Sequence, residues 1–156
     1  MTRAALLLLA AVVLAGCGNG QPKADPGVFA TQVLQQIVHN KYPQVWADLH
    51  PVDQKVAPFA EYISCENRSP VIALPRTVKV VRINDESVGL GDGSFVDSKA
   101  VHMRLGFAGG FTVTHTVHVV ASHGKWKWIL PSWRFRDYKA NRCPTAAGST
   151  PAPSTS

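Results

Sequence analysis

The sequence predicts an α+β domain in which helices pack on one face of a curved antiparallel sheet. After residue 25, apolar residues first recur at helical spacing, and in the second half of the chain they alternate with polar residues. This second half is also rich in Val, Thr and aromatic residues, which favour strands, and glycines separate several of the alternating runs. A helical block followed by consecutive strands is typical of α+β domains.

The first 16 residues predict a secretory signal peptide. A short positive start is followed by the apolar run 4–14, which is too short for a retained transmembrane helix. The run ends in Leu14-Ala15-Gly16-Cys17, which resembles the lipobox of bacterial lipoproteins. The resemblance implies that Cys17 is lipidated, becomes the mature N-terminus and anchors the protein to the outer, extracytoplasmic face of the cell membrane. An ordinary signal peptide with an incidental cysteine is the alternative.

The remaining chain is predicted to contain one folded domain. Residues 17–25 form a polar tether with Gly and Pro, whose reach as a flexible chain is about 15 Å. Residues 26–143 have the length of a single domain with one core. Residues 144–156 have no large apolar side chain, so we expect a disordered tail.

Three helices are predicted before the strands. Asp25 can cap the first helix and Pro26 fits its first turn. A short second helix around Trp46 is expected to end near Pro51, and a third covers about 58–65. The apolar face of the first helix carries Phe29, Val33, Leu34, Ile37 and Val38, whereas Thr and Gln residues occupy the other face.

Five strands are predicted in the second half, because alternation and β-branched or aromatic residues coincide there. The turns at Gly109-Gly110 and His123-Gly124 suit tight hairpins, which require residues that tolerate positive φ. We therefore expect a meander of antiparallel strands over residues 77–83, 99–107, 111–121, 125–130 and 133–138.

Three segments resemble the nuclear transport factor 2-like superfamily, in its branch of exported actinobacterial lipoproteins. These are Tyr42–Pro51, Ala100–Leu105 and Gly124–Leu130. The resemblance implies a cone, in which three N-terminal helices fold over a strongly bent antiparallel sheet and a cavity lies between them. Because the superfamily includes isomerases, dehydratases and many binding modules, the fold alone does not decide the function.

Cys65 and Cys143 remain once Cys17 is lipidated. An even pair of cysteines in an exported chain predicts one disulfide, although two separate buried thiols are the alternative. Their spacing fits neither a zinc site nor a redox Cys-x-x-Cys motif, so neither a metal nor a cofactor is predicted.

His115 is the candidate catalytic residue, because it is the one titratable group in the apolar row of its predicted strand. An imidazole suits proton transfer at neutral pH, and its carboxylate partner would be Asp48, Asp53 or Glu61. A buried neutral histidine is the alternative.

The tryptophans are candidates, with His115, to line a pocket for an apolar ligand. Such residues also fill cores, which is the alternative. The candidate pocket comprises Trp46, His115, Trp126 and Trp128.

Basic residues alternate away from the apolar set, which predicts a basic outer face on the sheet. The formal net charge of +6 agrees with this. Near a membrane, such a face would attract anionic lipid or a wall polymer, or it could contact another envelope protein; a merely solvated face is the alternative. No nucleic-acid-binding motif is present. The predicted basic face comprises His102, Arg104, His118, Lys125, Lys127, Arg134 and Arg136.

Taken together, these patterns predict a non-catalytic binding or scaffolding module at the cell envelope. Two alternatives remain open: a small isomerase-like or dehydratase-like enzyme that uses His115, and a carrier of an apolar small molecule. An open cavity with a carboxylate beside His115 would indicate the enzyme, whereas an apolar cavity without one would indicate the carrier.

Overall fold

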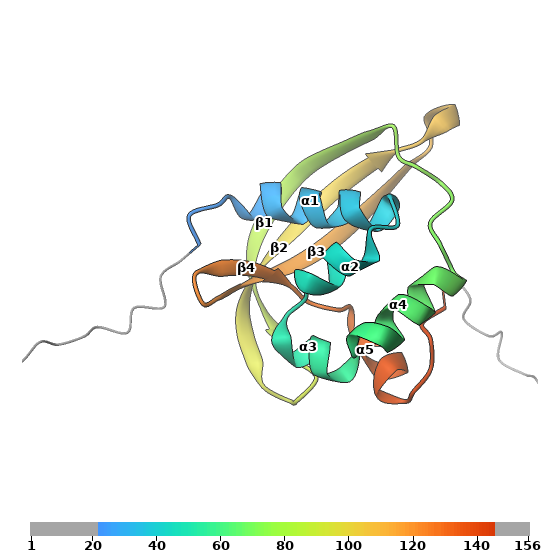
Figure 1. Cartoon of the computed structure of the whole chain (residues 1–156). Coiled ribbons are helices and arrows are strands. Elements are labelled where there is room, and N and C mark those ends of the chain that lie inside the picture. Colours follow the sequence, from blue (N-terminus) through green and yellow to red (C-terminus); the bar gives the residue numbers. More distant parts are fainter. Residues whose placement is uncertain (1–21, 146–156) are drawn as a thin grey trace, which may run out of the picture.

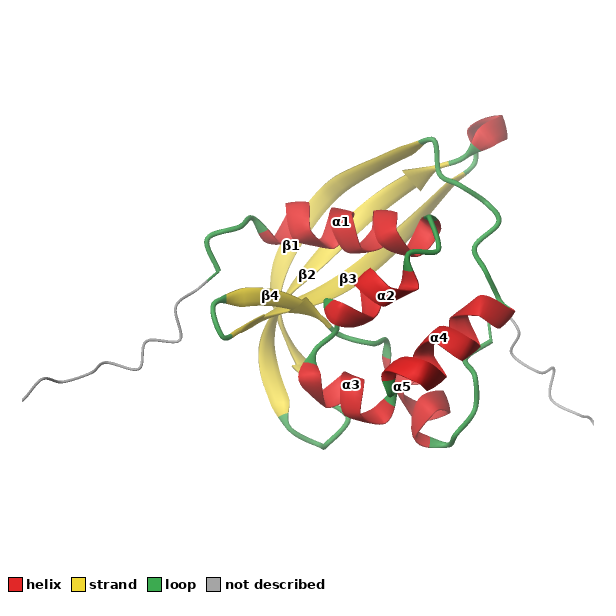
Figure 2. Cartoon of the chain, viewed as in Figure 1, coloured by secondary structure: helices red, strands yellow, loops and turns green. Residues whose placement is uncertain are grey.

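The computed structural model describes residues 22–145, which form five α-helices and one four-stranded antiparallel sheet (Figures 1 and 2). The predicted α+β order is confirmed. The predicted signal peptide, Cys17 and nearly all of the predicted tail lie outside the described residues. The elements are α1 (Pro26–Val38), α2 (Tyr42–Ala47), α3 (Pro51–Val56), α4 (Phe59–Arg68), β1 (Thr77–Gly89), β2 (Phe95–Gly106), β3 (Thr112–Ser122), β4 (Lys125–Trp128) and α5 (Ser132–Lys139).

Helix α1 begins as the sequence predicts. The Asp25 side chain caps it by accepting a hydrogen bond from Val28 N (3.0 Å), and Pro26 occupies its first turn. The helix lies across one face of the sheet, and its buried side chains pack into the core (Figure 1). The domain begins slightly earlier than predicted, because the carbonyl of Ala24 accepts a hydrogen bond from the Trp126 indole (2.6 Å).

Four helices, rather than the predicted three, precede the sheet. Helix α2 ends at Ala47, and Pro51 opens the additional helix α3. The His50 ring nitrogen caps α3 by accepting a hydrogen bond from Val52 N (3.4 Å). Because α3 has six residues, it is too short to show a helical period in the sequence.

The strands pair in chain order, β1-β2-β3-β4, and every pairing is antiparallel. The prediction ended the first strand at Ile83, but β1 continues to Gly89 through a polar stretch that pairs with the start of β2. The helices cover the concave face of the sheet, and the main core lies between them. From β2, β3 and β4 this core receives Val101, Met103, Leu105, Val117, Val119, Trp126 and Trp128.

The predicted fifth strand, 133–138, is wrong, because these residues belong to helix α5. Pro131 precedes the first helical residue, and Phe135 and Tyr138 are buried one helical turn apart. The Tyr138 ring stacks on Tyr62 of α4 with centroids 5.9 Å apart. The pattern that appeared to alternate is therefore the inner face of a short helix.

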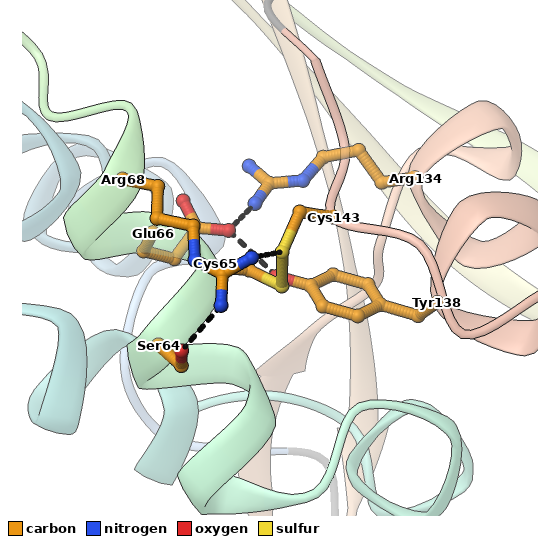
Figure 3. The surroundings of a disulfide bond; sticks show 7 residues. All are labelled: Ser64, Cys65, Glu66, Arg68, Arg134, Tyr138 and Cys143. Carbon is orange, nitrogen blue, oxygen red and sulfur yellow. Dashed lines mark hydrogen bonds and ion pairs between the residues drawn. A yellow bond between two sulfur atoms is a disulfide. The ribbon is translucent and has the colours of Figure 1, made fainter.

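The predicted disulfide between Cys65 and Cys143 is present (Figure 3). It joins α4 to the segment after α5. Beside it, Glu66 forms an ion pair with Arg134 and accepts a hydrogen bond from the Tyr138 hydroxyl (2.7 Å). The C-terminal helix is thus tied to the helical layer by one covalent and two polar links.

We predict that replacing both cysteines, Cys65→Ala with Cys143→Ala, lowers the free energy of unfolding. The disulfide closes a loop with a sequence separation of 78 residues, for which the chain-entropy model gives about 4 to 5 kcal/mol. Urea denaturation of the oxidised protein and the double variant measures the difference. A reducing agent should destabilise the original protein and leave the variant unchanged; equal stability of both proteins would contradict the prediction.

Candidate ligand site at the open edge of the sheet

The outer edge of β3 is paired along less than half of its length. Strand β4 pairs only with residues 119–122, whereas β2 pairs with β3 from Thr112 to Val119 on the other side. After β4 the chain makes one more contact with this edge, from Ile129 N to the carbonyl of His118 (3.1 Å). It then turns away through Pro131 into α5. No described strand pairs with the outer edge of residues 112–117.

A cleft of about 350 Å³ lies beside this open edge. One wall is formed by α1, a second by β3, and a third by the segment that leads from β4 into α5. Most of the lining side chains are apolar. They are Leu34, Ile37, His115, Thr116, Val117, Trp128, Ile129, Pro131, Trp133 and Arg134.

His115 lies in this cleft, as predicted, opposite Met103 of β2. Its side chain retains access to solvent, but the surrounding protein atoms remove part of its hydration and lower its pKa below the usual value. The imidazole is therefore neutral at pH 7. Within residues 22–145, its ring nitrogens form no hydrogen bond with another side chain. A neutral imidazole offers one donor and one acceptor to a ligand.

The three acids predicted as partners of His115 have other surroundings. Asp48 accepts a hydrogen bond from the Gln36 amide (3.4 Å), and Asp53 accepts one from Leu130 N (2.9 Å). Among the described side chains, no hydrogen bond joins Asp48, Asp53 or Glu61 to His115. The cleft therefore lacks the acid–base pair that the enzyme hypothesis requires.

The predicted tryptophan pocket is divided between different parts of the fold. Trp128 lines the cleft and donates its indole N–H to the carbonyl of Val45 (2.8 Å). Trp46 instead packs edge-on against Phe59 and bonds the carbonyl of Ala57 (2.8 Å). Trp126 is held against Ala24 at the start of the domain. Trp126 also borders a different cavity, of about 470 Å³. Of the four predicted pocket residues, Trp128 and His115 share the cleft.

Asp53 is a buried carboxylate close to the cleft, on the other side of the β4–α5 segment. Its side chain is 1% exposed, and Oδ1 has no hydrogen-bond partner among the described residues. Burial, reinforced by the charge of Asp92, raises its pKa to about 6, although the bond from Leu130 N opposes the rise. Asp53 also borders a second cavity of about 280 Å³, and Ile129 lines both cavities.

The predicted basic face requires correction at its helical members. Arg134 is directed into the fold, where it pairs with Glu66, and Arg136 lies on α5 beside the cavity at Asp53. The error follows from the incorrect fifth strand. Lys127 lies on β4 but donates to the carbonyl of Ala47 (2.7 Å), whereas Lys125 is exposed at the end of the β3–β4 turn.

His102 and His118 lie on the outer face of the sheet, as predicted, but an acid lies between them. Glu86 Oε2 is 3.1 Å from His118 Nε2, and Glu86 Oε1 is 3.9 Å from His102 Nε2. The hydrogen bond with His118 lowers the pKa of Glu86. His102 also contacts Thr116 Oγ1 through Nδ1 (2.9 Å). Within residues 22–145, no three His, Cys, Asp or Glu side chains are placed to hold a metal ion.

The sequence patterns do not predict two walls of the cleft. They place Leu34 and Ile37 on the core face of α1, and Trp133 on a strand. Pro131 and Ser132 before the Phe135 and Tyr138 pair are a helix-start signal that could have indicated α5. The contribution of α1 to the cleft depends on where the helix crosses the sheet, which no local pattern specifies.

No family model, curated protein or solved structure matches this chain in the three comparisons with known proteins. In the described part of the chain, no helix has the length and apolar character needed to cross a membrane. The functional argument therefore rests on the cleft and on the sequence.

We predict that Asp53→Asn makes the protein more stable than the original at high pH. The folded-state pKa of about 6 lies above the ordinary 3.8, so folding favours the protonated acid. The stability that protonation of Asp53 provides is fully present below about pH 4 and is lost as the pH rises through 6. The loss in the free energy of unfolding totals about 3 kcal/mol. The Asn side chain can still accept the bond from Leu130 N and has no charge to bury.

Urea denaturation of both proteins between pH 4 and pH 8 measures this difference. The advantage of Asp53→Asn over the original protein should grow as the pH rises. Asp97→Asn, at an exposed position, is the control and should show no comparable trend. A stability difference that stays constant across this pH range would contradict the ionisation of a buried Asp53.

Proposed function

We propose that this protein is a membrane-anchored, extracytoplasmic binding module that holds an apolar ligand in the cleft at His115 and does no chemistry on it. The observation that carries the proposal is the open, mostly apolar cleft of about 350 Å³ with a neutral imidazole in it. Small-molecule sites are typically concave and apolar, with a few polar groups that orient the ligand.

The residues of the cleft indicate the chemical class of the ligand. Leu34, Ile37 and Trp133 offer hydrocarbon and aromatic surface, and His115 offers one donor and one acceptor. The Arg134 charge is engaged by Glu66. These properties suit a single acyl chain or a small ring system that carries one hydrogen-bonding group.

A binding role accounts for His115 better than catalysis does. General acid–base catalysis by histidine usually relies on a group that orients the imidazole and stabilises its charged form. Here desolvation lowers the pKa of His115, and no described carboxylate contacts it. A ligand's polar group would supply the missing hydrogen bond.

We further propose a nuclear transport factor 2-like fold and a lipid anchor at Cys17. The order of the elements, helices first and then a bent antiparallel meander, supports the fold assignment. The support for the anchor is the lipobox-like sequence, since Cys17 lies outside the described residues. Two acyl chains are enough for stable anchoring, whereas a single chain binds marginally.

The ligand site is tested with dansyl-undecanoic acid, whose dansyl group accepts excitation energy from nearby tryptophans. We expect saturable binding to a chain that begins at Gly18, with transfer from Trp128 and Trp133. Trp133→Ser removes one apolar wall and should weaken binding about tenfold. His115→Ala should weaken it less, about fivefold, because it removes one hydrogen bond.

Phe95→Ser is the matched control, since Phe95 is an exposed aromatic residue at the far end of the β1–β2 hairpin. It should leave the affinity unchanged. Circular dichroism should show that each variant is folded. Saturable binding that none of the cleft variants alters would locate the site elsewhere and reject the proposal.

The anchor is tested by replacing Cys17 with Ser in the full chain produced in a bacterium that processes lipoproteins. The original protein should partition into the detergent phase of Triton X-114 and gain the mass of the lipid. Cys17→Ser should lose the added mass, because serine has no thiol to modify. An unchanged mass for the original protein would contradict lipidation.

A further inference from the structure

We propose that one end of the sheet is a docking surface for an anionic lipid membrane. This end, which we call the apolar tip, comprises the loop 70–76, the β2–β3 turn with its short helix η1 (Ala108–Gly110), and the start of β3 as far as Val113, at the upper right of Figure 1. Its exposed large apolar side chains are Ile72, Leu74, Phe111 and Val113.

A backbone hydrogen bond joins the loop to the end of β2, from Arg76 N to the carbonyl of Gly106 (2.7 Å). Within the β2–β3 turn, Phe107 N donates to the carbonyl of Phe111 (2.9 Å). The rings of Phe107 and Phe111 lie 5.1 Å apart. Ile72 is 92% exposed and Phe111 is 59% exposed. Large apolar side chains gathered at one end indicate an interaction site, whereas scattered ones do not.

The charges around the apolar tip have one sign. Residues 70–80 and 103–115 build this end of the sheet and contain no Asp or Glu. On β1 and β2, Lys79 lies directly opposite Arg104. Arg76 adjoins Gly106 at the very end. The acids of the sheet lie toward the opposite end, where Glu86 and Asp85 meet His118 and Lys99.

An anionic membrane is the occupant that matches both properties. Its acyl region accommodates exposed Ile, Leu and Phe side chains, and its headgroups attract the surrounding cations. Each Lys or Arg near an anionic surface strengthens binding by about fivefold. A purely anionic polymer would satisfy the cations and leave the apolar side chains in water.

The chain between the anchor and the domain is long enough for this docking, a step that rests on the proposed lipidation of Cys17. Ala24, which is bonded into the domain, lies seven positions after Cys17, a span of up to about 24 Å when the chain is extended. Helix α1 leads from there toward the apolar tip over about 20 Å, and Asn40 beyond its end bonds the tip loop at Val71 N (2.9 Å). The anchor and the apolar tip can therefore reach one membrane together.

Docking would also place the ligand cleft close to the lipid surface. Val113 and His115 lie on the concave face of β3, Phe111 directly precedes the strand, and all three are exposed. They form a continuous row from the apolar tip to the cleft.

Co-sedimentation with vesicles tests the proposal, using the chain that begins at Gly18 and therefore has no lipid anchor. We expect binding to vesicles of equal parts phosphatidylcholine and phosphatidylglycerol, and at least tenfold weaker binding to phosphatidylcholine alone. Ile72→Ser should weaken binding to the anionic vesicles, and Ile72→Ser with Phe111→Ser should weaken it about tenfold or more. Arg76→Gln with Lys79→Gln should remove most of the preference for anionic lipid.

Phe95→Ser is the control, because Phe95 is 75% exposed but lies at the opposite end of the sheet. It should bind vesicles as the original chain does. Because Ile72 is almost fully exposed, its replacement should not disturb folding, and thermal denaturation checks this for every variant.

Two results would overturn the proposal. Absence of binding to anionic vesicles at low salt is one, and an equal loss in Phe95→Ser and in the Ile72 variants is the other. If only the Arg76 and Lys79 variant loses binding, the surface recognises negative charge alone, and membrane docking through the apolar tip is rejected. None of these results depends on Cys17 or on the cleft, so failure of the docking proposal is distinguishable from failure of the proposed function.

Discussion

Pro131 is the residue on which the open side of the molecule depends, because it stands where the next hydrogen bond to β3 would be donated and has no N–H. Ile129 N still bonds β3. Alternate residues of a strand donate to the same neighbour, so Leu130 N faces the other side, where it bonds the buried carboxylate of Asp53. β4 therefore ends at Trp128 and the chain turns into α5. The outer edge of residues 112–117 is left without a partner strand, and the cleft occupies the space beside it.

The position of α5 is the second consequence of this turn. The Cys65–Cys143 disulfide and the contacts of Glu66 with Arg134 and Tyr138 fix the helix against α4. Trp133, at its start, then becomes a wall of the cleft. The helix is thus held from two sides, by the short backbone link at Leu130 and by the cross-links to α4. The walls of the cleft are therefore held by tertiary contacts before a ligand binds, which limits the conformational entropy that the protein loses on binding.

The sequence predicted the features that local chemistry determines. The cap at Asp25, the disulfide and the antiparallel meander follow from residue types and periods. It failed at α3 and α5, whose six and eight residues are too few to distinguish a helical period from alternation. Alternation along β3 predicts the correct face for His115. It does not predict that Asp53, one of the proposed partners, instead accepts a hydrogen bond from Leu130 N, because this contact joins residues far apart in the sequence. Likewise, tryptophan can line a pocket or fill a core, and the residue type alone does not show that Trp46 and Trp126 bond backbone carbonyls away from the cleft.

The distribution of charge along the sheet explains why an open strand edge is tolerated. Unpaired edges invite pairing with other chains, and proteins commonly protect them with charge or by covering them. Here the open part of β3 carries alternating threonines, with His115 on its inner face, and its strand neighbour contributes Arg104 opposite Thr114. Cations at this end repel a second copy of the chain and attract an anionic surface. The cations that favour membrane docking therefore also disfavour edge-to-edge association between copies of the chain.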